Sequence, residues 1–187
     1  MNPDVRRELM PRDEVLRLIG VLDGMKAMFL DAAEQWQLLD DTGHVPAAPV
    51  YADLIQHAAA AQDLSRDVVR LAADFARSPH STTRVGRAVL AHLATAATLS
   101  SNAAPRFAET AETALSLAGN PITYRYRANS MVLDHAAGRA YLRRASESLG
   151  DATKELNKHL DLHQFFPTPS PQQNLAPPPP GPDTRRR

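Results

Sequence analysis

The chain of 187 residues contains no cysteine, few aromatic residues and no excess of either charge. The absence of cysteine excludes disulfide bonds and thiolate metal sites. Aromatic residues make up 5% of the chain, and 21 basic side chains are balanced by 21 acidic ones. A net charge of zero gives no overall field that would draw the protein to nucleic acid or to an anionic membrane.

Long apolar runs and strand patterns are also missing. No stretch approaches the roughly 18 uninterrupted apolar residues of a membrane-spanning helix. The charged segment 1–14 does not have the apolar core of a secretory signal. There is no alternating β-branched run and no Asn-Gly hairpin, the usual signals of strands. We therefore expect an all-α, cytoplasmic protein that does not contact a membrane.

The chain does contain four segments with apolar residues at alternating steps of three and four, the spacing of a heptad repeat. They predict helices over residues 12–41, 50–77, 82–118 and 123–166. In the first and last helices the expected core residues are Val15, Leu18, Leu22, Met25, Phe29, Ala32, Trp36 and Leu39, and Met131, His135, Gly138, Leu142, Ala145, Leu149, Ala152 and Leu156. In the middle helices they are Val50, Leu54, His57, Ala61, Leu64, Val68, Leu71 and Phe75, and Val85, Val89, His92, Ala96, Leu99 and Ala103.

Four amphipathic helices joined by short loops predict an antiparallel, up-down-up-down four-helix bundle over residues 12–166. The third helix should begin near Ser81 or Thr82, either of which can cap it. It should kink or break near Pro105, because proline lacks an N–H donor and clashes with the preceding turn.

The two ends of the chain lack the heptad pattern of the bundle. Residues 1–11 are expected to form a flexible arm. The last helix is the longest, so its C-terminal part should either overhang the bundle or be covered by that arm. Residues 167–187 hold 8 prolines, which predicts a disordered tail with no core of its own. We favour a spacer over a docking peptide for aromatic-lined grooves.

No enzymatic motif is present. The sequence lacks a Gly-rich phosphate loop, Gly-x-Ser-x-Gly and His-Glu-x-x-His. It also lacks the paired Glu-x-x-His motifs of di-iron helical bundles. We therefore predict a protein that is not an enzyme, with no catalytic residues, no cofactor and no metal ligands.

Histidines on the expected core faces are the main candidates for a site. Counting residues from each loop brings His57 close to the level of His135, with about one helical turn between them. Their helices are diagonal partners in a square bundle, so the two rings could converge, with Glu34 as a third ligand. We favour the structural alternative, in which each histidine has its own local partner or reaches solvent, because two histidines make a poor zinc site.

His159 and His163 project from one face near the end of the last helix. Their spacing could hold a metal, but no third ligand is evident. We expect them instead to complement the negative end of the helix dipole.

Arginines give the last helix a basic character. Residues 121–150 carry Arg125, Arg127, Arg139, Arg143 and Arg144 against Asp134 and Glu147, a net charge of +3. A basic helix can follow phosphates, but residues 12–41 carry a net charge of −4. We expect Arg139 to lie near Glu34 and Arg143 near Asp31, so that these charges pair within the bundle.

The third helix is rich in small residues, namely Ala88, Ala91, Ala94, Ala96, Ala97, Ala103 and Ala104. Gly138 comes level with Ala104, which predicts close packing of two backbones. The aromatic side chains Phe29, Trp36, Phe75 and Phe107 should fill the remaining core.

These observations favour a non-enzymatic helical bundle that acts through contact with an unidentified protein or with a second copy of itself. One alternative is a bundle that binds a small molecule or a metal, based on the histidines and the alanine-rich helix. The other is a nucleic-acid accessory protein that uses the arginines of the last helix.

Overall fold

The computed structural model describes residues 10–46, 51–119 and 121–165. Within these ranges the chain forms helices and contains no strand. In chain order the elements are α2 (Arg12–Gln35), α3 (Tyr51–Ala76), α4 (Arg84–Ser101), α5 (Ala103–Leu115), the short 3₁₀ helix η1 (Ser116–Gly119) and α6 (Pro121–Phe165). The helices α4 and α5 follow one another along a single rod, so the fold is an antiparallel four-helix bundle, as predicted.

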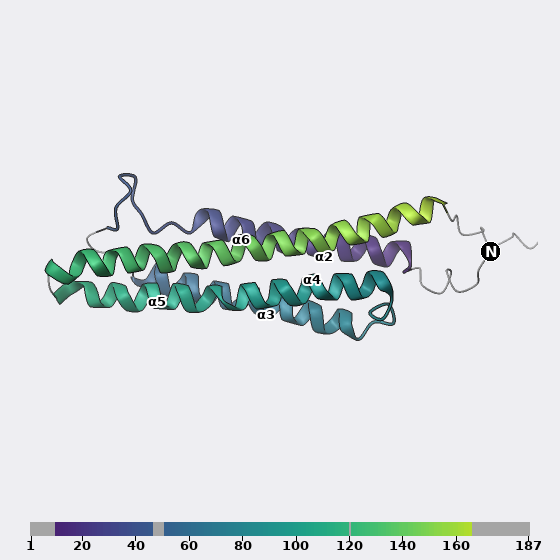
Figure 1. Ribbon diagram of the computed structural model, residues 1–187, viewed down its shortest axis with the longest axis horizontal. Coiled ribbons are helices and arrows are strands. Elements are labelled where there is room, and N and C mark those ends of the chain that lie inside the picture. The colour runs from purple at the N-terminus through teal and green to yellow at the C-terminus, as the bar shows by residue number, and fades with distance from the viewer. Residues whose placement is uncertain (1–9, 47–50, 120, 166–187) are drawn as a thin grey trace, which may run out of the picture.

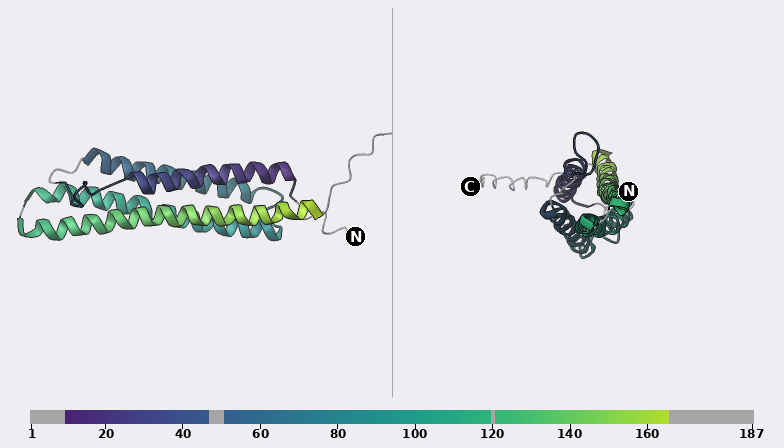
Figure 2. Two further views of the ribbon diagram at one scale, coloured as in Figure 1. Left: turned by 90° about the horizontal axis from the view of Figure 1, so that it is seen from above. Right: turned by 90° about the vertical axis from the view of Figure 1, so that its left-hand side faces the viewer.

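The helices form two layers. In Figure 1, α6 and α2 lie side by side above α4, α5 and α3. The helix α6 packs against α2 and against both α4 and α5, whereas α3 packs against α4 and α5. The helices α2 and α3 scarcely touch, so the bundle is open along this edge. The end-on view in Figure 2 shows the same arrangement around a common axis.

The core contains most of the predicted heptad positions of the first and last helices, α2 and α6. All eight predicted positions of α6, from Met131 to Leu156, are buried. The first six predicted positions of α2, from Val15 to Ala32, are buried as well. Phe29, Phe107 and Phe75 fill the interior, and Phe29 and Phe107 are completely inaccessible to solvent. The predicted seam of α6 is thus confirmed at all eight positions, and that of α2 at its first six.

The third predicted helix is broken beside Pro105. The helix α4 ends at Ser101 and α5 begins at Ala103, so Asn102 alone separates them. Pro105 is then the third residue of α5, in the first turn, where a missing N–H removes no intrahelical bond. The predicted break is confirmed.

Two details of this helix were predicted incorrectly. The cap is Thr83, whose Oγ1 accepts a hydrogen bond from the N–H of Gly86 at 3.0 Å. The core face of α4 also contains Leu93, and His92 is only half-buried. Gly86 and Ser100 are buried on the same side as Leu93, so this face lies one residue away from the predicted one.

The predicted end of the first helix was also wrong. Instead of reaching residue 41, α2 ends at Gln35, about halfway along α6 (Figure 1). Nε of Arg139 donates a hydrogen bond of 2.6 Å to the carbonyl of Ala33. That carbonyl is one of the last in the helix and needs a partner outside it, so a side chain of α6 helps to terminate α2.

Beyond α2 the chain continues as a non-helical segment, residues 36–46. Its Leu38 is buried, whereas Leu39, the predicted core residue, is 40% exposed. Leu38 joins a second, smaller apolar cluster that consists of Leu38, Leu54, Ala111, Leu117 and Met131. In this half of the bundle the segment therefore takes the place of a fourth helix.

The start of the described chain contacts α6 near its C-terminal end. Met10 is buried, and its N–H donates a hydrogen bond of 3.1 Å to Nε2 of His159. The predicted flexible arm therefore has a fixed end at Met10. Residues 1–9 and the predicted tail, 167–187, lie outside the described residues.

None of the described helices combines the length and the apolar character that a membrane span requires.

Candidate functional site

Four rings meet in the middle of the bundle, at the level where α2 ends. The rings of His57 on α3 and His135 on α6 converge, with centroids 5.8 Å apart. Trp36, directly after α2, stacks on His57 at 4.9 Å with only 10° between the ring planes. Phe107 on α5 completes the group. We call Trp36, His57, Phe107 and His135 the four-ring layer.

Phe107 is the hub of this layer. Its centroid lies 5.2 Å from Trp36, 6.1 Å from His57 and 5.2 Å from His135, edge to face in each case. Such ring pairs contribute about 0.5–1.5 kcal/mol each beyond the area they bury. Since one ring comes from each of the four rods of the bundle, the layer joins the diagonal helices α3 and α6, whose backbones do not touch.

Gly138 makes room for the layer. A Cβ atom at this position would lie 2.9 Å from Cζ of Phe107, closer than real side chains approach. The space beside Gly138 is therefore occupied by the Phe107 ring and not, as predicted, by a neighbouring backbone.

Replacing Gly138 by alanine is expected to destabilise the protein by about 1–3 kcal/mol, because Phe107 is held by three other rings and cannot yield freely. Gly20→Ala is the matched control, since nothing lies within 4 Å of its Cβ position. That control should stabilise the protein by up to about 1 kcal/mol through helix propensity. Urea unfolding of both variants measures the difference, and equal stabilisation by both would contradict the tight fit at Gly138.

Burial keeps both histidines neutral at pH 7. His135 is 2% exposed, and burial, together with the nearby His57 and Arg139, lowers its pKa to about 4. Burial also lowers the pKa of His57, and Asp53, one turn earlier on α3, partly opposes that shift. A neutral imidazole offers one hydrogen-bond donor and one acceptor, so the layer can bind polar groups without carrying charge.

The structural alternative predicted a local partner or solvent for each of these histidines. The structure contradicts this expectation in part, because Nδ1 of His57 and Nε2 of His135 are buried without a hydrogen-bond partner among the described residues. A buried polar atom without a partner costs about 1–3 kcal/mol. Native proteins contain few such atoms, and they often mark functional positions.

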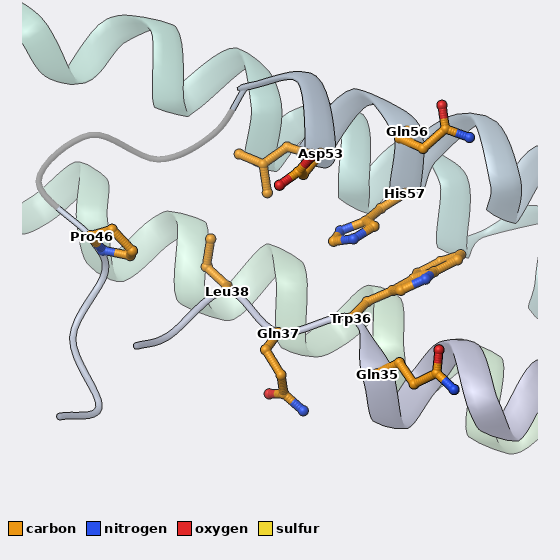
Figure 3. Close-up of a pocket in the computed structure, with 9 residues that line it drawn as sticks. Gln35, Trp36, Gln37, Leu38, Pro46, Asp53, Gln56 and His57 are labelled. Atoms are coloured by element: carbon orange, nitrogen blue, oxygen red, sulfur yellow. The ribbon is translucent and has the colours of Figure 1, made fainter. Parts of the chain in front are cut away.

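A cavity of about 470 Å³ lies beside the layer. Residues 35–38 and Pro46 form one wall, and Asp53, Leu54, Gln56 and His57 form the other. Figure 3 shows the His57 ring extending from α3 toward Trp36, with Asp53 near the start of the same helix. The volume is within the range of about 300–1,000 Å³ that is usual for small-molecule sites.

Glu34 is not part of this site. Both Glu34 and Asp53 are exposed, but Asp53 lines the cavity and Glu34 does not, and the carboxylate that acts on His57 is that of Asp53. Asp53 was missed in the sequence because it lies off the core face, although its spacing of four from His57 could have pointed to it. Among the described residues, no group of three or more His, Cys, Asp or Glu side chains could hold a metal ion.

The arginines of α6 are partly occupied within the protein. Arg139 bonds the Ala33 carbonyl and, through Nη1, the side-chain oxygen of Gln37 at 3.0 Å. Arg127 donates to the Ser116 carbonyl. Arg125, Arg143 and Arg144 are exposed to solvent.

The predicted ion pairs between the first and last helices are not present. Arg139 uses its guanidinium for carbonyl groups rather than for Glu34, and among the described side chains no ion pair joins α2 to α6. The polar contacts between these helices include hydrogen bonds to backbone carbonyls: besides Arg139, Ser146 donates to the Lys26 carbonyl at 3.1 Å.

The remaining histidines lie apart from the four-ring layer. The backbone carbonyl of His92 accepts a hydrogen bond from Oγ of Ser148 on α6 at 2.9 Å. His159 holds Met10 rather than a helix terminus. The His163 side chain is outside the described part of the structure.

Comparison with known proteins gives no match to a family model, to a curated protein or to a solved structure.

Proposed function

We propose that the protein is a non-enzymatic, cytoplasmic helical bundle that acts by binding another polypeptide along the outer face of α6. The observation that carries this proposal is a second heptad on that helix. Tyr126 and Leu133 are seven residues apart and are 79% and 70% exposed, the highest values among the large apolar side chains of the described residues. Ala140, one heptad further, is also exposed.

The inner face of α6 is already filled by its own bundle, so these residues have no role in the core. An apolar seam at heptad spacing is what a helix presents to a further helix. The exposed Arg125, Arg143 and Arg144 favour an acidic partner helix, because opposite charges beside a seam select the partner.

The helix α2 repeats the feature on a smaller scale. Val21 and Met28, again seven residues apart, are 40% and 45% exposed. Amphipathic helices are commonly recognised by apolar residues at this spacing. The partner could be a different protein or a second copy of this chain, and both agree with the proposal.

The test is site-specific photo-crosslinking in the native host, with a photoreactive residue in place of Leu133. The matched control places it at Val69, which is 49% exposed on α3 but has no large apolar residue one heptad away. We expect a discrete adduct from position 133, lost on Tyr126→Ser, and none from position 69. An adduct of twice the chain's mass identifies self-association. No adduct at position 133, or the same adducts from both positions, would contradict the proposal.

A further inference from the structure

We propose that the cavity beside the four-ring layer is a binding site for a small organic cation, such as a primary ammonium. The site exists because α2 ends at Gln35 and residues 36–46 take its place without filling the same volume. A helix that continued to residue 41, as its sequence pattern predicts, would fill more of this space. The end of α2 is thus the structural reason for the cavity.

Charge is the first reason for a cation. Among the described residues, Asp53 is the single formally charged side chain in the wall of the cavity. In the same part of the chain no arginine or lysine lines it, and the nearby Arg139 is engaged with the Gln37 side chain and the Ala33 carbonyl. The wall therefore offers a negative group and no positive one, which disfavours an anionic ligand.

The supply of acceptors is the second reason. An ammonium group carries three donors and no acceptor. The cavity presents the Asp53 carboxylate, the carboxamide oxygens of Gln35 and Gln56, and the neutral ring of His57, whose Nδ1 has no partner among the described residues. A hydrogen bond from a cation to a carboxylate is stronger than one between neutral groups.

The aromatic wall is the third reason. The indole of Trp36 lines the cavity, and the face of an indole attracts cations more strongly than other side-chain rings do. Leu38, Leu54 and Pro46 supply apolar surface for the carbon skeleton of such a ligand. A metal ion fits this wall poorly, because the described residues of the wall supply one carboxylate and one imidazole and no third such ligand.

The test uses three probes of nearly equal size that differ in charge: 2-phenylethylamine as the cation, 2-phenylethanol as the neutral molecule and 3-phenylpropionate as the anion. Trp36 is the one tryptophan of the chain, so its fluorescence reports on this cavity without a label. We expect saturable binding of 2-phenylethylamine that is about tenfold or more tighter than binding of either other probe, the difference that one hydrogen bond to a charged group supplies.

Asp53→Asn removes the charge and keeps the shape of the wall. This variant should lose the preference for 2-phenylethylamine, while Asp67→Asn, an exposed change on the same helix, should keep it. Circular dichroism establishes that both variants are folded. Equal affinity for all three probes, no saturable change with any of them, or the same affinity for 2-phenylethylamine in both variants would overturn the proposal. None of these results depends on the outer face of α6, so the crosslinking experiment can succeed or fail independently.

Discussion

Replacing Phe29 or Leu142 by alanine is expected to lower the free energy of unfolding by about 3–5 and 2–5 kcal/mol, respectively, the range for large buried side chains. Both side chains are completely inaccessible to solvent, and they lie on the contacting helices α2 and α6. Each substitution removes apolar contacts and leaves a cavity that close-packed neighbours fill only in part.

Leu133→Ala is the matched control for Leu142→Ala, because it makes the same change on the same helix at a position that is 70% exposed. Surface substitutions of this kind usually change stability by less than about 0.5 kcal/mol. Urea unfolding followed by circular dichroism measures all three variants. If Leu133→Ala and Leu142→Ala were equally stable, the inner and outer faces of α6 would be assigned incorrectly.

The second large effect concerns pH. A pKa of about 4 for His135 in the folded protein, against an ordinary value of 6.5, means that the unfolded chain takes up the proton first as the pH falls. Stability should therefore be complete above about pH 6.5 and decline between pH 6.5 and pH 4. The contribution of His135 to this decline is about 3 kcal/mol.

His135→Phe separates this contribution from those of the carboxylates. Phenylalanine keeps an aromatic ring at this position and cannot be protonated, so the variant should lose less stability than the parent over the same pH interval. His57 acts in the same direction, since its pKa is also lowered by burial. Unfolding free energies at pH 7, 5.5 and 4 for parent and variant measure the effect. Parallel curves would show that His135 is not a buried neutral group.

The heptad pattern was sufficient to predict the bundle, because apolar residues at steps of three and four must lie on one face of a helix. Residue counts from each loop also placed His57 and His135 within about one helical turn of each other, but the favoured expectation was a separate local partner or solvent for each ring, and the structure brings the two rings together. The participation of Trp36 and Phe107 in a single layer could not be predicted, because it depends on the rotation of each helix and on side-chain conformations.

At the end of α2, contacts with residues distant in sequence override the local heptad pattern. Trp36 and Leu39 continue the heptad of this helix, and the usual stop signals, Gly43 and Pro46, follow later. In the structure Arg139 bonds the Ala33 carbonyl, and Trp36 stacks on His57. Both partners are distant in sequence, so the sequence of α2 alone carried no sign of this termination.

The core face of α4 was missed for a different reason. Val89 and Ala96 belong to both the predicted and the observed faces, which differ by one residue at the positions between them. Large apolar residues at Val85 and Leu99 favoured the wrong choice. The structure buries Gly86 and Ser100 instead, because small side chains allow neighbouring backbones to come close; a Cβ at Gly86 would overlap the His80 carbonyl oxygen.

The most direct test of the four-ring layer is an NMR titration of the His135 imidazole, with the His135→Phe variant to identify its resonance. A ring that is enclosed by Trp36, His57 and Phe107 should remain neutral through pH 6 and titrate with a midpoint of about 4. A midpoint near 6.5 would mean that the ring is in contact with water and that the four helices do not meet in this layer.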